Sequence, residues 1–205
     1  YNLNGGSVST SNPSTYTIES SSFTLNNPSK LGYTFDGWTG TGLTNTPLDE
    51  HPIYTNTVTI NNGSYGDRYY AANWYINTYP INYNLNGGEA TNPSNYNVET
   101  PTFTLSNPTR EGYNFIGWTR TDDNATESER NTLQLEVTIS KGSVGDRKFS
   151  AHWETITYNI HYNMNDDLAD GDVSRADEYT PIKTRYNIET ANFTLTKPTR
   201  QGYTF

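Results

Sequence analysis

The densest group of side chains that could do chemistry is the acidic stretch from Asn165 to Asp172. Carboxylate oxygens are the ligands that Ca²⁺ prefers in proteins. If Asp166 opens an EF-hand loop, Gly171 falls at the required sixth position, but Leu168 stands at the third, where an oxygen ligand is needed. We therefore interpret the stretch as a solvated loop insertion. Calcium binding is the alternative, and its candidate ligands are Asp166, Asp167, Asp170 and Asp172.

A second acidic group lies between residues 122 and 129, where Asp122, Asp123, Glu127 and Glu129 occur close together. Each of the two acidic groups occurs once, in a chain that otherwise repeats much of its sequence. A residue that recurs in every copy is expected to maintain a fold, whereas a loop present in one copy is free to specialise. These two loops are therefore the places where a specific partner could bind.

The residues that usually carry catalysis are not arranged for it. The histidines His51, His152 and His161 occupy unrelated positions. The chain contains no Gly-x-Ser-x-Gly elbow, no His-Glu-x-x-His motif and no phosphate-binding loop. It also contains no cysteine, which excludes disulfides, thiol chemistry and zinc–thiolate sites. We expect the protein not to be an enzyme and to hold no cofactor.

The dominant feature of the chain is an internal repeat. The passage from Phe23 to Trp38 recurs from Phe103 to Trp118, which is 80 positions later, and begins a third time at Phe193. This spacing is longer than the roughly 20–50 residues of most solenoid repeats, so each copy is expected to be a small domain. We expect three units: residues 1–75 with a truncated first strand, residues 76–154, and residues 155–205, which stop before their Gly-Trp strand.

The residue pattern within a unit predicts β-strands. Apolar Ile81, Tyr83 and Leu85 alternate with polar Asn82 and Asn84, as in a half-buried strand. Turn residues separate the extended pieces, and no stretch has a sustained helical period. In the second unit the expected strands cover residues 81–85, 96–98, 113–118, 137–139 and 148–153. The expected fold class is mainly β, with tandem small domains of about 80 residues arranged end to end and little or no helix.

Aromatic residues are expected to form the core of each unit, because only 32% of the chain is hydrophobic and aliphatic residues are scarce. Each aromatic side chain can bury roughly 150–250 Å². Sugar stacking is the alternative for the tryptophans, but they stand at repeated positions on expected strands, which favours packing. The predicted core residues are Trp38, Trp74, Trp118, Trp153, Phe23, Phe103, Phe193, Tyr33, Tyr113 and Tyr203.

A Gly-Ser-x-Gly-Asp-Arg motif occurs in both long units. Its last three residues are Gly66, Asp67 and Arg68 in the first unit and Gly145, Asp146 and Arg147 in the second. Glycine permits unusual backbone angles, and aspartate can bond backbone amides or pair with arginine. We interpret the motif as a structural turn between two strands, and a recognition loop is the alternative.

The charge and hydropathy of the chain exclude several partners. The net charge is −9, from 13 basic and 22 acidic residues, and no basic cluster occurs. These features argue against nucleic acid and anionic membranes as partners. The longest apolar runs are a few residues, so we expect no direct membrane insertion. The joins between units are six residues or shorter and lack a Gly/Ser run, so neighbouring repeats are expected to be partners held at a restricted angle.

The repeated residues resemble the Listeria–Bacteroides repeat, also called the internalin B-repeat. The resemblance rests on the Tyr-Asn-Leu-Asn-Gly-Gly opening, the central Asn-Pro-Thr-Arg-Glu-Gly-Tyr-x-Phe-x-Gly-Trp motif and the closing Ala-x-Trp, and it covers essentially the whole chain. It implies a β-grasp-like domain found in tandem in bacterial surface proteins, many from Gram-positive organisms. The third copy departs from the pattern, because Asn165-Asp166-Asp167 replaces Asn-Gly-Gly.

Two functions follow from this resemblance as expectations. The first is a structural module of an extracellular, cell-surface protein, which acts as a semi-rigid stalk that projects a distal binding region. The second is an adhesive module that binds a host protein or a glycan through its variable loops. The sequence itself looks like a section of a longer repeat array, because it opens and closes inside a repeat motif.

Overall fold

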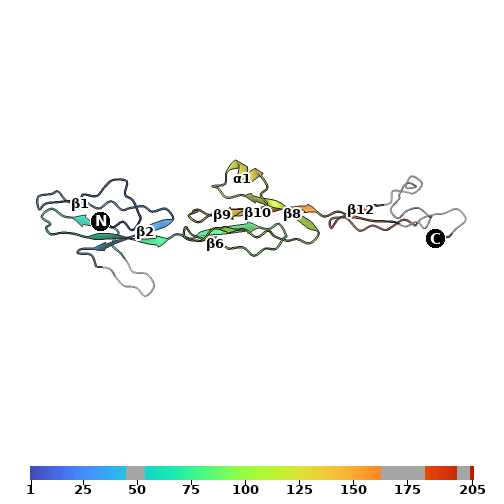
Figure 1. The fold of residues 1–205 in the computed structure, drawn as a ribbon, viewed down its shortest axis with the longest axis horizontal. Helices are drawn as coiled ribbons and strands as arrows, with labels where there is room; N and C mark the ends of the chain where they lie inside the picture. Colours follow the sequence, from blue (N-terminus) through green and yellow to red (C-terminus); the bar gives the residue numbers. More distant parts are fainter. Residues whose placement is uncertain (45–53, 163–182, 198–203) are drawn as a thin grey trace. The chain divides into compact units, whose positions relative to one another are not determined.

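The computed structural model describes residues 1–44, 54–162, 183–197 and 204–205 (Figure 1). Within these residues the fold is mainly β, as expected, with short strands and one helix of five residues. The β-grasp-like arrangement that the resemblance implies stays a prediction. The strands of the first repeat are β1 (Phe23–Thr24), β2 (Tyr33–Gly40), β3 (Thr59–Ile60) and β4 (Tyr70–Ile76).

The second repeat contains counterparts of these four strands and adds two further strands, β5 and β6, and the helix. Its elements are β5 (Tyr79–Asn84), β6 (Asn95–Tyr96), β7 (Phe103–Thr104), β8 (Tyr113–Arg120), α1 (Glu127–Asn131), β9 (Thr138–Ile139) and β10 (Arg147–Thr155). Two short strands follow, β11 (Tyr158–Asn159) and β12 (Arg185–Tyr186). Helix α1 lies beside β8 (Figure 1).

The strand pairings repeat together with the sequence. Strand β1 pairs antiparallel with β3, and β7 pairs in the same way with β9. The long pair β2–β4 is matched by the antiparallel pair β8–β10. The short pair β5–β6 is matched by β11–β12. Strands β6, β5, β10 and β8 stand in that order in a four-stranded sheet.

A bulge in each long strand sets the direction of the central tryptophan. Phe35 pairs with Trp74 but Gly37 pairs with Asn73, so Asp36 is an extra residue in β2. An extra residue also separates Phe115 from Gly117 in β8. Gly37 has a φ of +124° and Gly117 a φ of +139°, a region that favours glycine. The bulge and the glycine explain why Gly-Trp recurs as a unit in the sequence.

The core of each repeat is centred on this tryptophan. Trp38 and Trp118 are fully buried, and so are the alanines that pair with them, Ala72 and Ala151. Around Trp38 the other buried residues are Leu25, Val58, Ile60 and Tyr70. The second repeat buries Leu105, Val137, Ile139 and Phe149 at the corresponding positions.

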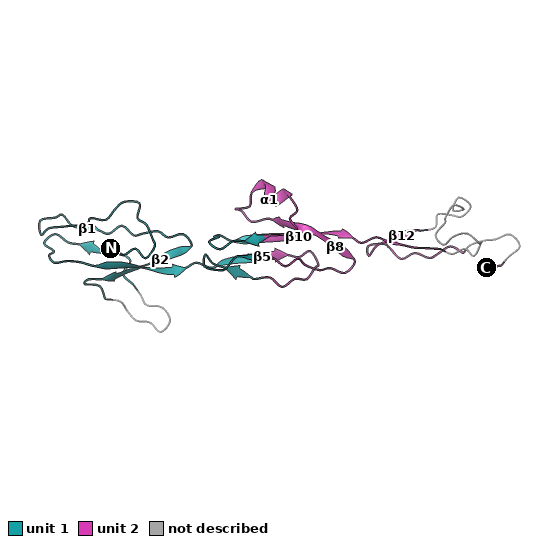
Figure 2. Ribbon diagram, viewed as in Figure 1, with its two compact units in different colours: residues 1–82, 93–104, 138–147 teal, residues 83–92, 105–137, 148–205 magenta. Residues whose placement is uncertain are grey.

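The chain forms two compact units that cut across the expected repeat boundaries (Figure 2). The first unit comprises residues 1–82, 93–104 and 138–147, and the second comprises residues 83–92, 105–137 and 148–205. The first unit therefore contains all of the first repeat and three segments of the next, residues 76–82, 93–104 and 138–147. The repeat boundaries at residues 75 and 154 themselves stay a prediction.

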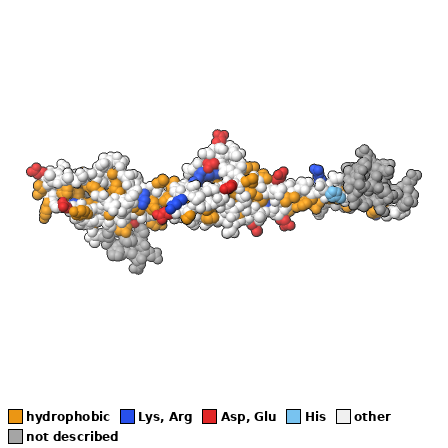
Figure 3. Space-filling view, in the orientation of Figure 1, with side chains coloured by type: hydrophobic (Ala, Val, Ile, Leu, Met, Phe, Trp, Pro, Cys, Tyr) orange, Lys and Arg blue, Asp and Glu red, His pale blue; other side chains and the backbone are white. Residues whose placement is uncertain are grey.

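The surface of the described residues carries no large patch of one charge on the face drawn in Figure 3, where acidic and basic side chains are dispersed among uncharged ones. Many exposed large side chains are tyrosines, among them Tyr65, Tyr69 and Tyr75. No helix in the described ranges has the length and apolar character needed to cross a membrane.

Candidate functional site

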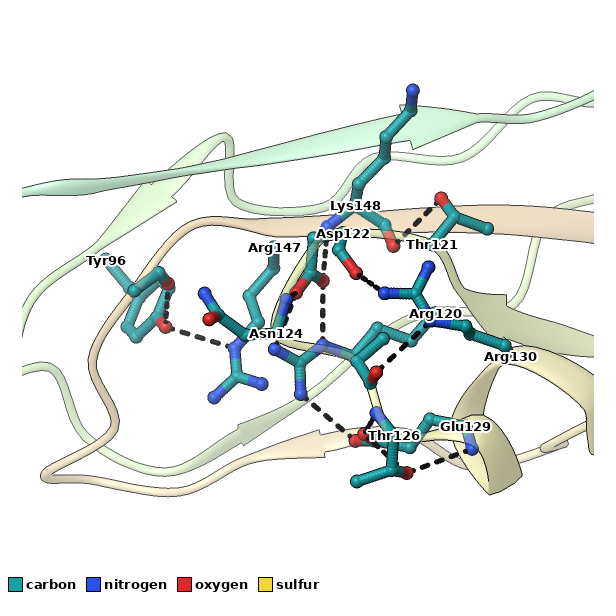
Figure 4. A network of polar contacts seen from close by, with 12 residues as sticks. Tyr96, Arg120, Thr121, Asp122, Asn124, Thr126, Glu129, Arg130, Arg147 and Lys148 are labelled. Atoms are coloured by element: carbon teal, nitrogen blue, oxygen red, sulfur yellow. Dashed lines mark hydrogen bonds and ion pairs between the residues drawn. The ribbon is translucent and has the colours of Figure 1, made fainter.

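The loop between β8 and β9 is held by an arginine that only the second repeat has. Arg120 Nε and Nη2 donate to the two carboxylate oxygens of Asp122 at 2.7 Å each, and Nη1 donates to Glu129 Oε1 at 3.1 Å (Figure 4). The Arg120 and Asp122 side chains are about one-tenth exposed. A bidentate arginine–carboxylate ion pair of this kind is among the stronger polar interactions in proteins.

Helix α1 is fixed by the same acidic side chains. Thr126 caps the helix, since its hydroxyl accepts from Glu129 N at 3.2 Å, while Glu129 Oε2 accepts from Thr126 N at 2.8 Å. Asp122 Oδ2 also accepts from Lys148 N at 3.1 Å, which ties the loop to β10. Asp122 and Glu129 therefore hold the loop together, and they are not free carboxylates awaiting a cation.

The charge of these two carboxylates should make the loop sensitive to acid. Burial raises the pKa of Asp122, but the hydrogen bonds from the Arg120 side chain and from the backbone N–H groups of Lys148 and Asn124, together with the charge of Arg120, outweigh it and the pKa is lowered. The backbone bond from Thr126 lowers the pKa of Glu129, against some desolvation, with help from the Thr126 hydroxyl and Arg120. Because both pKa values fall on folding, their stabilisation is present above the unfolded values of about 4 and is lost as the pH falls through the folded values.

We expect the α1 amide resonances to lose their dispersion as the pH falls below the unfolded values of about 4, before the rest of the second repeat unfolds. An NMR titration of the full chain measures this. Arg120→Ala is the control, since it should release the loop at neutral pH and so remove the acid-dependent step. A loop that stays ordered at pH 2 in the unsubstituted chain would contradict the prediction.

The candidate calcium ligands Asp166, Asp167, Asp170 and Asp172 lie outside the described residues. Within the described ranges, no group of three or more His, Cys, Asp or Glu side chains is placed to hold a metal ion.

In both repeats a tyrosine hydroxyl forms hydrogen bonds to the glycine and the arginine of the Gly-Asp-Arg motif. Tyr96 donates its hydroxyl to Gly145 O at 2.5 Å and accepts from Arg147 Nε at 3.1 Å. In the first repeat, Tyr16 makes the same two contacts with Gly66 O at 2.5 Å and Arg68 Nε at 3.0 Å. Gly66 and Gly145 have φ values of +85° and +88°. These contacts favour the structural turn over the recognition loop.

Tyr96→Phe should therefore destabilise the second repeat by about 1–3 kcal/mol. Tyr96 is buried, and the substitution removes the hydroxyl that bonds Gly145 O and Arg147. Urea denaturation followed by residue-resolved hydrogen exchange measures the change. Tyr65→Phe, at a side chain that is 83% exposed, is the matched control and should have little effect. Equal stability of the two variants would exclude the hydrogen bonds of the Tyr96 hydroxyl as a source of stability.

The side chains of all four tryptophans make contacts within their own repeats. Trp38 and Trp118 donate their indole N–H groups to Asn27 and Asn107 at 2.9 and 3.2 Å. Trp74 and Trp153 are half-buried and donate to the carbonyls of Leu3 and Leu85 at 3.1 and 3.0 Å. A Cβ on Gly6 would lie 2.3 Å from Trp74, and one on Gly88 would lie as close to Trp153, which explains the second glycine of Asn-Gly-Gly. This packing favours a structural role over sugar stacking.

The first contact between successive repeats is built from Gly32 and Tyr33 of the first repeat and Val98 and Glu99 of the second. We call these four residues the first joint. Tyr33 donates its hydroxyl to Glu99, and a Cβ on Gly32 would lie 1.6 Å from Val98 Cγ1. Asn77 of the connecting segment donates its N–H to Gly32 O at 3.0 Å. The hydrogen bond to Glu99 raises the pKa of Tyr33.

The same contact recurs between the second and third repeats, where Gly112, Tyr113, Ile188 and Glu189 form the second joint. Tyr113 donates its hydroxyl to Glu189 Oε1 at 2.8 Å. A Cβ on Gly112 would lie 2.7 Å from Ile188 Cδ1, and Gly112 O accepts from Ile156 N at 2.9 Å. A cation covers the tyrosine ring in both joints: Lys30 Nζ at 4.0 Å from the Tyr33 ring and Arg110 Cζ at 3.6 Å from the Tyr113 ring.

The structure corrects the expected core at three positions. Tyr33 and Tyr113 are only half-buried, because their rings lie at the joints and not under the central tryptophans. Phe193 is 41% exposed, whereas Phe23 pairs with Ile60 and Phe103 pairs with Ile139. Among the described residues Phe193 lies outside any strand, so it has no antiparallel partner of the kind that covers the other two phenylalanines. Tyr203 lies outside the described residues.

Comparison with known proteins gives two matches. The model of one family, described as the Listeria-Bacteroides repeat domain, matches residues 1–61 and 79–140. Over 138 residues the chain is 27% identical to a protein of Evansella cellulosilytica that is provisionally described as a membrane protein. The aligned region covers 65% of this chain and 18% of that protein, so the chain spans less than a fifth of its relative's length. No solved structure matches the chain.

Proposed function

The chain belongs to the Listeria-Bacteroides repeat domain family, and we propose that it is a structural repeat module, a semi-rigid stalk that projects a distal binding region from a bacterial cell surface. The family match and the relative provisionally described as a membrane protein both agree with a tandem-repeat module of a surface protein. The stalk is our proposal for what the repeats do there.

The observation that carries the proposal is the recurrence of the joint. A flexible tether needs a connection without specific contacts, as in Gly/Ser-rich linkers. Here each connection adds a backbone hydrogen bond to a glycine, an apolar side chain over that glycine, and a tyrosine bonded to the glutamate of the next repeat. These contacts support a fixed angle between successive repeats, which is what a spacer needs.

Displaying the full chain between a cell-wall anchor and a reporter epitope tests the stalk directly. Antibody access to the epitope should increase steadily as one, two and three copies of the chain are inserted. A Gly/Ser linker of the same number of residues is the control, because the span of a random coil grows only as about the square root of its length. Equal access through the chain and the linker would show that the repeats act as a tether and not as a stalk.

Adhesion through a variable loop is the second candidate, and the loop around α1 favours it. This loop is ordered by its own Arg120 network, none of the α1 residues is buried, and Leu133 and Leu135 beside it are exposed. An array screen of the full chain against glycans and matrix proteins, with and without Ca²⁺, tests this role. Binding that is lost on Leu135→Ser but kept on Tyr65→Ser would support adhesion through the loop, and an array without signal would contradict it.

A further inference from the structure

Each repeat carries one copy of a short turn in which a β-branched apolar residue precedes glutamate and a hydroxyl residue. The three copies are residues 18–20, 98–100 and 188–190. All three adopt the same conformation. The hydroxyls of Ser20, Thr100 and Thr190 accept from the N–H three residues earlier at 2.9 Å each, and their own N–H groups donate back at 3.0 to 3.1 Å. The turn is thus preformed within its own repeat.

Two of the three turns are covered by the preceding repeat. Val98 and Glu99 contact Gly32 and Tyr33 in the first joint, and Ile188 and Glu189 make the same contacts with Gly112 and Tyr113 in the second. The partner is the same pair of residue types in both cases. The turn therefore has a specific complement, which is a glycine followed by a tyrosine.

The third turn contacts no Gly-Tyr pair within the described residues, since no glycine there lies against Ile18 as Gly32 lies against Val98. Ile18 is 61% exposed, compared with 50% for Ile188 and a half-buried Val98, and Glu19 is exposed beside it. We call these two residues the Ile18–Glu19 face. It presents the same apolar group and the same carboxylate, in the same backbone conformation, as the two turns that are covered.

The chemistry of this face restricts what can cover it. The apolar side chain needs a partner without a Cβ at the closest point, because a methyl group on Gly32 or Gly112 would lie 1.6 to 2.7 Å from the Val98 or Ile188 side chain. The carboxylate needs a hydroxyl donor on the next residue, as Tyr33 and Tyr113 supply. A Gly-Tyr pair on a turn with positive φ meets both needs, since Gly32 and Gly112 have φ values of +77° and +76°.

We propose that the Ile18–Glu19 face is a docking surface for the Gly-Tyr turn of another repeat of the same family. The inference rests on the proposed function, because it treats the joint as the general way in which these repeats connect. The occupant is a repeat and not an unrelated protein, since continuity with the two joints already present in the chain specifies the glycine, the tyrosine and their order.

An extended chain tests the proposal. Residues 1–161 are added as a second copy ahead of Tyr1 of the full chain, because Tyr1 then takes the place that Tyr162 has after His161 in the repeated sequence. The added copy thereby places its Gly112 and Tyr113 before the Ile18–Glu19 face. The chain has no cysteine, so a single Ile18→Cys in the original copy reports its own accessibility through the rate of thiol labelling.

Ile18→Cys should label more slowly in the extended chain than in the unextended one, at a rate reduced to that of Val98→Cys, because the docked Gly-Tyr turn would leave less of the side chain accessible. Val98→Cys is the reference for a covered turn and should label slowly in both chains. Tyr65→Cys, at a fully accessible position, should label equally fast in both. Gly112→Ala with Tyr113→Phe, made only in the added copy, should restore fast labelling of Ile18→Cys.

Three results would overturn the proposal. If Ile18→Cys labels equally fast with and without the added copy while Val98→Cys is slow, the joints hold but this face is not a docking surface. If Val98→Cys labels as fast as Tyr65→Cys, the joint itself fails and the proposed stalk fails with it. If protection of Ile18→Cys survives the two substitutions in the added copy, another part of the molecule covers the face. Nuclear Overhauser contacts between the Ile18 methyls and Gly112 Hα in the unsubstituted extended chain check the result without a cysteine.

Discussion

Trp118→Ala is expected to lower the free energy of unfolding of the second repeat by about 3–5 kcal/mol. Trp118 is fully buried, and its ring lies 5.4 Å from the ring centre of Phe115 and 6.4 Å from that of Phe149. Its indole N–H donates to Asn107, so the substitution also removes the hydrogen bond of a partly buried amide. A small domain has few other buried residues that could move to fill such a cavity.

Native-state hydrogen exchange of the full chain measures this cost, because it reports the stability of each repeat separately. The first repeat, built around Trp38, is the internal reference and should keep its protection. Trp118→Phe separates the two contributions, because it retains much of the aromatic packing and loses the hydrogen bond to Asn107. Tyr65→Ala, at an exposed site, is the control and should change the free energy of unfolding by less than about 0.5 kcal/mol. Unchanged protection in Trp118→Ala would mean that Trp118 is not a core residue.

The repeated part of the fold could be predicted from the sequence because a strand pattern is local. The strands expected at residues 113–118 and 148–153 are observed as Tyr113–Arg120 and Arg147–Thr155, and the one expected at 137–139 is observed as Thr138–Ile139. The burial of Trp38 and Trp118 follows from the same pattern, since both recur on a face that alternates with polar residues. Strand β7 (Phe103–Thr104) is not among the expected strands, because it is two residues long and is defined by its pairing with β9. The other differences lie at strand ends, where pairing depends on partners distant in sequence.

The helix and its arginine could not be predicted from the repeat, because they depart from it. Arg120 stands where the first repeat has Gly40, and its ligands Asp122 and Glu129 lie in the loop that follows. The only local signal is Thr126 followed three residues later by Glu129, which is the pattern of a capping box. A helix of five residues has no hydrophobic period that would reveal it.

The joints were missed for a different reason. Tyr33 and Glu99 are 66 positions apart, and Tyr113 and Glu189 are 76 positions apart, so neither contact leaves a trace in a local pattern. The signal that could have found them is the recurrence of glutamate after Ile18, Val98 and Ile188 in turns with no other reason to be fixed. Recurrence in every repeat is expected of core residues, but a tandem array also repeats its interfaces, and the tyrosines of Gly-Tyr belong to those interfaces.

Gly32→Ala should open the first joint while leaving each repeat folded. The new methyl group would meet Val98 Cγ1 at 1.6 Å, so Val98 must leave its place over Gly32, and the alanine must also adopt a φ near +77°. The left-handed backbone costs roughly 1–2 kcal/mol and the displaced packing about 1–3 kcal/mol more. The N–H of Asn77, which donates to Gly32 O, should then exchange faster, and the Val98 methyl resonances should shift towards those of an exposed valine.

Gly63→Ala separates the two costs, because Gly63 has a φ of +83° and no atom within 4 Å of an added Cβ. This variant carries the backbone strain without the collision, so its Val98 signals should be unchanged. Residual dipolar couplings give the decisive comparison: the first and second repeats should share one alignment in the unsubstituted chain and in Gly63→Ala, and should align independently in Gly32→Ala. If both variants keep a common alignment, the angle between repeats is set by the short connection alone. Independent alignment in the unsubstituted chain would instead mean that the joint is too weak to make a stalk.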